Sequence, residues 1–364
     1  MNEITNRITG VQRKFDQRDS MLTRASLGEE PDKKVRNWAK TPTPDPLYRT
    51  MMGIPRSENC LTYHLVSAVD GPVNPEKVPI TNTAELTKKI KLIANFFGAD
   101  RVGITKLNQA YVASHRADEY LVGSKAFGKA INLQHENTIS LIFKRDYHLV
   151  KAGHSFIDGG EGTFIYNKVA VVACQLAAYI RELGYSAKAH HEREEEVLQV
   201  PLAVEAGMGE LGRLGMLITP EFGPRVRIST VTTNLPLLLD KPINIGVQSF
   251  CELCKKCAQN CPSGAIPRGN KVNVRGVEKW VIEPRKCLGF WGVDKTKWDD
   301  CSMCITTCPY NRPENWFNKM HHKSIFFNAL KRKSFAKLML WIDDRIRGKR
   351  PRYKVRWMGY SNYE

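Results

Sequence analysis

The segment CELCKKCAQNCP, residues 251–262, decides most of what this sequence predicts. Its four cysteines and final proline fit the C-x2-C-x2-C-x3-C-P run of bacterial ferredoxins, which carry two [4Fe–4S] clusters. In that run the first three thiolates bind one cluster and the fourth binds the other, so a partner run must follow. The run CSMCITTCP, residues 301–309, is such a partner, and Cys287 precedes it.

The interlocking of the two runs predicts how eight of the ten cysteines are shared. One cluster is expected to be held by Cys251, Cys254, Cys257 and Cys308. The other is expected to be held by Cys261, Cys287, Cys301 and Cys304. Two structural zinc sites are the competing interpretation, because CxxC pairs also suit zinc. Two proline-terminated runs in one short segment favour the clusters.

The rest of the chain is too long for a simple electron carrier. It has 364 residues, of which 42% are hydrophobic and 25% are charged, as in ordinary soluble proteins. Residues 1–247 precede the cysteine runs and have room for a second redox centre or a substrate site. The two remaining cysteines, Cys60 and Cys174, stand apart. Cys174 lies in the apolar stretch VAVVACQLAAYI and is expected to be a buried small side chain.

The pattern divides the chain into four predicted segments. Residues 1–80 are irregular and proline-rich, and we expect them to wrap a domain rather than build one. Residues 81–247 form the core, residues 248–312 the double-cluster domain, and residues 313–364 a basic helical extension. In that extension an apolar helical face is expected, mainly to pack on the body, with a membrane or dimer surface as the alternative. Its members would be Ile325, Phe326, Phe327, Leu330, Leu338, Trp341 and Ile342.

Within the core, helices and strands alternate, which favours an α/β or α+β layered domain. Asn82 followed by Glu85 is a helix-start signal, and apolar spacing then continues to Gly98. A long apolar helix is predicted from about residue 162 to Gly184, where glycine supplies a stop. Strands are predicted over residues 101–105, 139–143, 216–219 and 226–233.

Charge and termini suggest partners and location. The net charge is +18, and basic residues concentrate in KRK (331–333) and RIRGKRPRYKVR (345–356). Nucleic-acid binding is not expected, because no recognised binding module accompanies the charge. A solvated face, a docking surface for an acidic electron carrier and attraction to an anionic membrane remain open.

The location prediction rests on the N-terminal residues and on hydropathy. No uninterrupted apolar run approaches the roughly 18 residues of a membrane span. The first residues contain neither a twin-arginine pair nor an apolar signal region, so the sequence predicts a cytoplasmic protein. The alternative is an exported, membrane-associated protein whose twin-arginine leader has been removed.

The glycines Gly207, Gly209 and Gly212 spell G-x-G-x-x-G, the dinucleotide-binding fingerprint. That fingerprint requires a strand before it and a helix after it. Here PLAVEA precedes the glycines, and the proline and glycine of GMLITPEFGP soon follow them, so a dinucleotide site is disfavoured. Glycines at these positions could instead let the backbone approach a large planar cofactor.

Four stretches, in order along the chain, resemble the corrinoid-dependent reductive dehalogenases. The longest is AVEAGMGELGRLGMLITPEFGPRVRISTVTTNLPL, residues 203–237. The others are FDQRDSMLTRA (15–25), AYIRELGYSAKA (178–189) and CPYNRPENWF after the last cluster cysteine. The related epoxyqueuosine reductases share the architecture. The absence of the twin-arginine leader favours a cytoplasmic branch of the family.

The resemblance implies an α+β fold, with a nitroreductase-like corrinoid-binding α/β core followed by a bacterial ferredoxin-like module with two [4Fe–4S] clusters. It also implies a cobalamin or related corrinoid bound base-off, since no Asp-x-His-x-x-Gly motif occurs. Residues predicted to contact the corrinoid are Gly207, Gly209, Glu210, Gly212, Arg213 and Thr219.

For catalysis, the resemblance points to a tyrosine that supplies a proton. The matching residue is Tyr166, in GTFIYNKVAVV. A tyrosine has an ordinary pKa of about 10, and a nearby cation would make it a better donor. Arg225 is the best match for that cation, and Arg227 is the alternative. A third polar residue is expected near residues 190–192, although the charge run HEREEE could also be solvated.

The function that the resemblance implies is reductive dehalogenation. Halogen on an organohalide would be replaced by hydrogen, using a corrinoid reduced to Co(I) by the two clusters. An external ferredoxin or flavodoxin would supply the electrons. One alternative is reduction of a non-halogenated substrate such as epoxyqueuosine in tRNA. Another, from a different class, is a non-catalytic electron carrier.

Overall fold

The computed structural model describes residues 7–8, 14–33, 35, 57, 60–117, 121–291, 301–313, 330–349, 351, 353–357 and 360–361. Its centre is an antiparallel sheet with the strand order β2-β3-β7-β4. The strands are β2 (Arg101–Lys106), β3 (Asn137–Lys144), β7 (Val226–Thr233) and β4 (Ala187–His190). Three of them confirm predicted strands. A mixed helix and strand architecture is therefore confirmed, and the parallel sheet of a dinucleotide-binding domain is absent from the described core.

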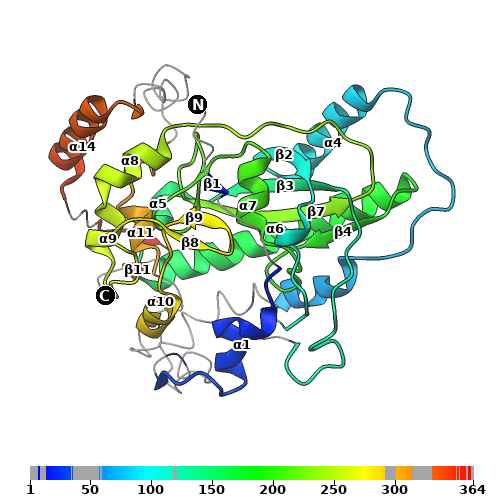
Figure 1. Cartoon of the computed structure of the whole chain (residues 1–364), viewed down its shortest axis with the longest axis horizontal. Helices are drawn as coiled ribbons and strands as arrows, with labels where there is room; N and C mark the ends of the chain where they lie inside the picture. Colours follow the sequence, from blue (N-terminus) through cyan, green and yellow to red (C-terminus); the bar gives the residue numbers. More distant parts are fainter. Residues whose placement is uncertain are drawn as a thin grey trace.

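The two faces of the sheet have different partners because side chains alternate along each strand. Ile139, Leu141 and Phe143 point to one face and pack with α4 (Thr83–Phe97) and α6 (Phe156–Glu182). Ile142 and Val226 point to the other face and pack with α7 (Gln199–Glu205). Figure 1 shows the sheet between these helices, with the cluster-side elements gathered at one end.

The long helix α6 begins earlier than the sequence predicts. It starts after Ser155, so its first turns contain the glycines of DGGEG, which are poor helix formers and hid this part of the helix. Its end is confirmed at Gly184, which has a φ of +84°. A Cβ at this position would also lie 2.6 Å from the Glu76 carbonyl oxygen. By length and composition α6 could cross a membrane, contrary to the sequence-based expectation, but half of its most apolar stretch is buried. A buried helix in a protein core can have the same length and apolar composition.

Of two other predicted elements, one is confirmed and one is shorter than predicted. The helix start at Asn82 is confirmed, since its side chain accepts a hydrogen bond from the Glu85 amide. The strand predicted over residues 216–219 reduces to β6 (Leu217–Ile218), which pairs with β5 (Glu210–Leu211). It ends there because the hydroxyl and amide of Thr219 both bond to the Gly223 carbonyl and close a tight turn.

The cluster-side part of the chain is built from short elements. They are α8 (Val247–Cys254), α9 (Lys256–Asn260), β8 (Val272–Val274), β9 (Val277–Lys279), α10 (Pro284–Trp291) and α11 (Met303–Thr306). The N-terminal strand β1 (Arg7–Ile8) pairs with β9. Further along that segment, Glu30 forms an ion pair with Arg285 of α10 at 2.6 Å. The N-terminal residues therefore contact the cluster-side part, while the four-segment division stays a prediction.

The helical extension contains α14 (Lys333–Arg347), which packs on α8. Residues 325–327 of the predicted apolar face lie outside the described residues. Of the others, Leu338 and Trp341 are exposed, and the side chains that pack inward are Phe335, Ala336, Met339 and Leu340. The predicted membership of the packing face is therefore wrong for Leu338 and Trp341.

The remaining elements connect these parts. They are η1 (Gln17–Asp19), α1 (Met21–Ser26), η2 (Leu65–Ala68), η3 (Gln109–Tyr111), α5 (Tyr147–Val150), β10 (Arg356–Trp357) and β11 (Tyr360–Ser361).

Candidate functional site

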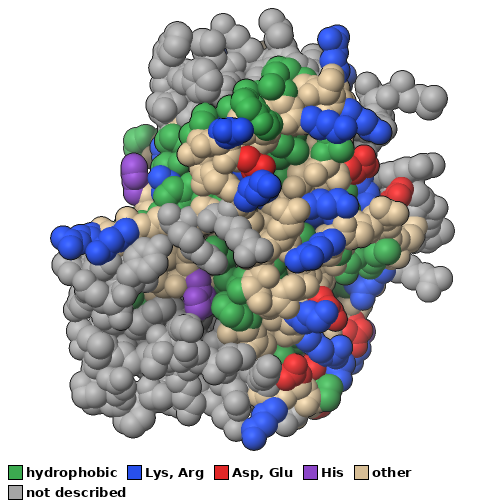
Figure 2. All heavy atoms as spheres, turned by 90° about the vertical axis from the view of Figure 1, so that its left-hand side faces the viewer, with side chains coloured by type: hydrophobic (Ala, Val, Ile, Leu, Met, Phe, Trp, Pro, Cys, Tyr) green, Lys and Arg blue, Asp and Glu red, His purple; other side chains and the backbone are tan. Residues whose placement is uncertain are grey.

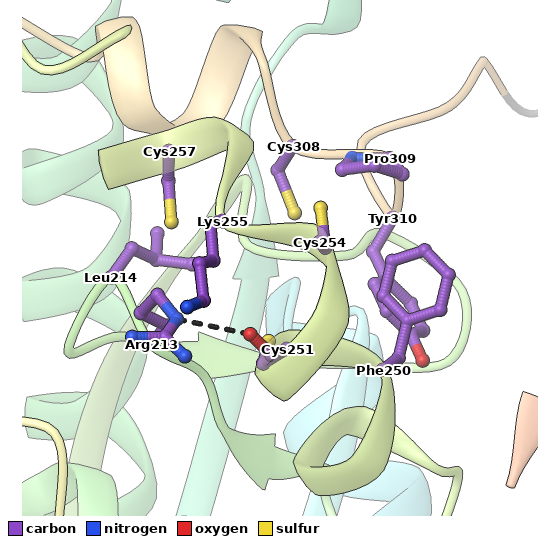
Figure 3. Close-up of a pocket in the computed structure, with 10 residues that line it drawn as sticks. All are labelled: Arg213, Leu214, Phe250, Cys251, Cys254, Lys255, Cys257, Cys308, Pro309 and Tyr310. Atoms are coloured by element: carbon purple, nitrogen blue, oxygen red, sulfur yellow. Dashed lines mark hydrogen bonds between the residues drawn. The ribbon is translucent and has the colours of Figure 1, made fainter. Parts of the chain in front are cut away.

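Four cysteines surround one cavity at the cluster end of the molecule. They are Cys251, Cys254, Cys257 and Cys308, the set that the interlocked runs assign to one cluster. Figure 3 shows the sulfur atoms of Cys254, Cys257 and Cys308 turned toward the same space. Within the described residues, no three His, Cys, Asp or Glu side chains are grouped for a single metal ion.

Local backbone geometry produces this arrangement. Cys251 and Cys254 lie one turn apart on α8, so their side chains share a helix face. Lys255 then adopts a φ of +49°, which ends α8 and turns the chain into α9, where Cys257 lies. Cys308 comes from the turn after α11. The C-x2-C-x2-C spacing is therefore a helix turn followed by a sharp change of direction.

Three of the four thiols around the cavity are buried, and this affects their pKa values. Burial raises the pKa of Cys251 to about 12 and that of Cys308 to about 11. Thiolates are therefore stable here only when a positively charged metal centre replaces the lost solvation. A cysteine-lined, buried cavity of this kind suits iron–sulfur ligation and does not suit a free reactive thiolate.

The second predicted ligand set comes from four separate places on the same side of the molecule. Its members are Cys261 at the end of α9, Cys287 on α10, Cys301 before α11, and Cys304 on α11. All four are partly exposed. At Cys261 burial acts to raise the pKa, but hydrogen bonds from the Ser263 hydroxyl and nearby backbone amides lower it overall. Cys304 also lies within electrostatic reach of Cys257, so the two sets are neighbours.

Arg213 ties the sheet domain to the first cysteine set. Its guanidinium is buried and donates hydrogen bonds to the carbonyl oxygens of Cys251 (3.0 Å), Pro267 (2.9 Å) and Gly269 (2.8 Å). It also stacks on the Trp280 ring at 4.4 Å. The predicted corrinoid contact of Arg213 remains untested, and the structure gives this residue a role inside the protein.

Glu210 makes a second connection nearby, between β5 and the start of α8. Its carboxylate accepts hydrogen bonds from the amides of Ile245 and Val247 and from the Gln248 side chain, where α8 begins. Burial raises the pKa of Glu210, and these hydrogen bonds oppose the rise. The β5–β6 hairpin therefore holds the start of the first cluster motif.

The glycines of the G-x-G-x-x-G pattern also have a packing role in the structure. The glycines do allow close approach, but the approaching groups belong to the chain itself. A Cβ on Gly209 would lie 2.2 Å from the Ile218 carbonyl oxygen, and one on Gly207 would lie 2.4 Å from that of Lys241. A Cβ on Gly212 would meet the Ile218 side chain at 2.5 Å. Contact of these glycines with a corrinoid stays a prediction.

The structure places a different arginine beside Tyr166 from the one the sequence favoured. The Arg227 guanidinium carbon lies 4.7 Å from the centre of the Tyr166 ring. Arg225 is fully buried and donates hydrogen bonds to the carbonyl oxygens of Arg145 (2.7 Å) and Arg312 (3.2 Å). The reason is strand alternation: Arg227 lies within β7 on the face covered by α6, whereas Arg225 precedes the strand.

Most of the charge run at residues 191–196 is buried, and Glu192 and Glu195 are half-buried, which corrects the solvated alternative. Glu194 and Glu196 both pair with Arg116 and Lys188, and the Lys188–Glu196 distance is 2.7 Å. Burial lowers the pKa of His191 to about 4. The site residue predicted near positions 190–192 therefore has an interior environment, with His191 neutral at physiological pH.

A row of polar side chains crosses the sheet on the face opposite α6. Ser140 on β3 pairs with Thr230 on β7, which pairs with His190 on β4, and Thr138 lies two residues before Ser140. All four side chains are fully buried. The three hydroxyl groups and Nδ1 of His190 have no hydrogen-bond partner among the described residues. Such groups are costly unless a ligand or water satisfies them.

Sequence reasoning missed Arg145. This fully buried side chain forms ion pairs with Asp158 (2.8 Å) and Glu161 (2.6 Å) and donates to the Ser302 hydroxyl at 3.2 Å. It therefore connects the end of β3, the start of α6 and the loop between Cys301 and Cys304. Two acids three residues apart at the start of an apolar helix were the available signal.

Comparison with known proteins first identifies the class. Residues 250–312 match the family of 4Fe-4S dicluster domains. Together with the cysteine cavity, this match makes the chain an iron–sulfur protein with two [4Fe–4S] clusters.

The relatives then identify the family. Over 307 residues the chain is 31% identical to a tetrachloroethene reductive dehalogenase of Sulfurospirillum multivorans, a match that covers 76% of this chain and 60% of the relative. A tetrachloroethene reductive dehalogenase of Dehalobacter restrictus is 31% identical over 275 residues, which cover 64% of this chain and 49% of the relative. An epoxyqueuosine reductase of Listeria monocytogenes is 30% identical over 119 residues, or 32% of this chain and 30% of the relative.

The fold is also shared. The solved structure of a catabolic reductive dehalogenase superposes with a TM-score of 0.80 and 24% identity, covering 99% of this chain and 51% of that chain. The chain is thus homologous to the reductive dehalogenases, as the sequence resemblance indicated. It spans about half the length of that structure and 49–60% of the two tetrachloroethene reductive dehalogenases described above.

Proposed function

We propose that the chain is the catalytic part of a reductive dehalogenase, which replaces a halogen of an organohalide by hydrogen. Two electrons and one proton enter, and a halide ion leaves. The proposal is supported by the homologous dehalogenases and by a cluster module tied into the core through Arg213 and Arg145. The observation that carries it is the Arg227 guanidinium stacked over the Tyr166 ring.

One solved reductive dehalogenase structure is described in terms of B12-dependent dehalogenation, and we propose that this chain also binds a corrinoid. A corrinoid carries many amide groups, and the polar row of Thr138, Ser140, Thr230 and His190 offers buried groups that need partners. We propose these residues as its contacts in addition to those predicted from the sequence. When bound, the corrinoid supplies a cobalt centre that, once reduced to Co(I), removes the halogen.

In this proposal Tyr166 gives its phenolic proton to the carbon that loses the halide. The proton transfer leaves a tyrosinate, which the adjacent positive charge of Arg227 stabilises. We propose a structural role for Arg225, because it donates hydrogen bonds to the backbone carbonyl oxygens of Arg145 and Arg312.

The test compares two tyrosines on the same helix. The proteins are reconstituted anaerobically with iron, sulfide and hydroxocobalamin, and turnover is measured on chlorinated and brominated phenols and ethenes. Tyr166→Phe should lower turnover by about 10²–10⁴-fold, the usual contribution of a positioned proton donor, and leave bound cobalamin unchanged. Tyr179→Phe, further along α6, should retain the wild-type rate. Wild-type turnover in the Tyr166 variant would remove this residue from the mechanism.

A second candidate is reduction of epoxyqueuosine in tRNA, which the match to epoxyqueuosine reductases and the net charge of +18 favour. The same reconstituted protein is assayed on tRNA containing epoxyqueuosine. Turnover of that tRNA without turnover of any organohalide would overturn the dehalogenase proposal. Cluster absorbance with no bound corrinoid would instead identify an electron carrier.

A further inference from the structure

The inner face of α14 covers the helix that carries two cluster cysteines. Phe335, Ala336, Met339 and Leu340 belong to one apolar cluster with Leu253 and Cys254 of α8, among others. The C-terminal half of α14 is fastened by charge, since Asp343 pairs with Lys256 of α9 and with Arg347. Arg347 in turn donates to the Cys308 carbonyl oxygen at 3.0 Å. The helix therefore lies directly on the segments that hold the first cysteine set.

The outer face of α14 is both apolar and cationic. Leu338 and Trp341 are 50% and 57% exposed, and the Arg345 guanidinium lies 5.2 Å from the Trp341 ring centre. Exposed lysines flank this pair on both sides, at Lys333, Lys337 and Lys349. The two acids of the helix, Asp343 and Asp344, both pair with Lys256 on the inner side. Figure 2 shows the cluster end of the molecule, where green and blue side chains lie together with few red ones.

We propose that this outer face of α14 is the docking surface for an acidic electron-donor protein. The inference rests on the proposed function, because a reductase needs an outside source of electrons. One helix, about 10–12 Å in diameter, separates the exposed face from the cysteine cavity. Redox encounters use small interfaces that opposite charge steers together, and tryptophan and arginine are the usual anchors of an interface.

A lipid surface fits the same face less well. Interfacial helices present a continuous apolar stripe to the membrane. Here the exposed Arg345 is seven positions after Leu338 and lies about 20° from it around the helix, so a cation interrupts the apolar surface of Leu338, Trp341 and Ile346. The exposed apolar residues thus surround a cation and are flanked by lysines, as expected for a protein interface with a polar rim.

The experiment measures electron transfer from a donor protein to the clusters and does not involve dehalogenation. The reconstituted protein is mixed with reduced plant-type [2Fe–2S] ferredoxin, an acidic protein, and cluster bleaching is followed by stopped-flow absorbance at low and high salt. Lys337→Glu with Arg345→Glu should slow ferredoxin-driven reduction about tenfold or more at low salt and abolish its salt dependence. Reduction by titanium(III) citrate should be unchanged, which shows that the clusters are intact.

The control reverses the same charge elsewhere. Lys125→Glu with Lys129→Glu lies on an exposed loop of the core and should leave the ferredoxin rate unchanged. Trp341→Ala should weaken docking without altering charge. Equal slowing in the control pair, or a wild-type rate in the α14 pair, would overturn the inference. So would co-sedimentation of the protein with phosphatidylglycerol vesicles combined with a salt-independent ferredoxin rate. A chain that reduces no organohalide could still pass this test, so the two proposals fail separately.

Discussion

Replacing Gly209 by alanine is expected to destabilise the protein without any cofactor present. The added Cβ would lie 2.2 Å from the Ile218 carbonyl oxygen and 2.8 Å from its carbon, and both atoms are backbone. Contacts this short require the β5–β6 hairpin to open by roughly 1 Å, because a Cβ needs more than about 3 Å. Opening the hairpin also disturbs Glu210, whose carboxylate holds the amides that begin α8.

The expected cost is about 3 kcal/mol, typical of overpacking that moves backbone. It is measured as the shift in urea midpoint of the metal-free and cobalamin-free protein, followed by tryptophan fluorescence. Gly159→Ala is the matched control. It lies in α6 with nothing within 4 Å of the new Cβ, so it should stabilise by about 0.5–1 kcal/mol.

The opposite result would restore the cofactor interpretation of this glycine. If Gly209→Ala unfolds at the wild-type urea concentration yet no longer binds hydroxocobalamin, the glycine serves a ligand. The packing argument would then be refuted.

Two further predictions concern the hydrogen bonds of Arg213 and the buried side chain of His191. Arg213→Met leaves three backbone carbonyls without their donor, so we expect a loss of roughly 3 kcal/mol and a lower iron content; wild-type iron content would contradict this. His191 has a pKa of about 4 when folded and 6.5 ordinarily, so the unfolded chain binds more protons in that window and stability falls as pH falls from 6.5 to 4. His191→Gln should remove roughly 3 kcal/mol of this acid sensitivity. Matching urea-versus-pH profiles for His191→Gln and the wild-type protein would refute the assignment.

The cysteine spacing predicted the first cluster set because its geometry is local. Cys251, Cys254 and Cys257 are positioned by one helix turn and one sharp bend, and both are consequences of short spacing. Strand positions were also predictable, because most residues of β3 and β7 are apolar or β-branched. The strand order was not, because it depends on pairing between residues far apart in the chain.

The arginine beside Tyr166 could have been chosen correctly from the sequence. Val231 packs under α6, and alternation back along the strand places Arg227 on the same face. Similarity of motif favoured Arg225 instead. The buried ion pairs of Glu194 and Glu196 could not have been predicted, because their partners Arg116 and Lys188 lie in other segments, and a run of charges ordinarily indicates a solvated surface.

The sharing of one cavity between Cys308 and the three earlier cysteines has a consequence for biosynthesis. During translation, Cys251, Cys254 and Cys257 leave the ribosome well before their fourth partner. A nascent chain halted between them presents three thiols and no complete ligand set. Insertion of a fully ligated cluster at this cavity must therefore follow synthesis of Cys308, about fifty residues after the other three ligands.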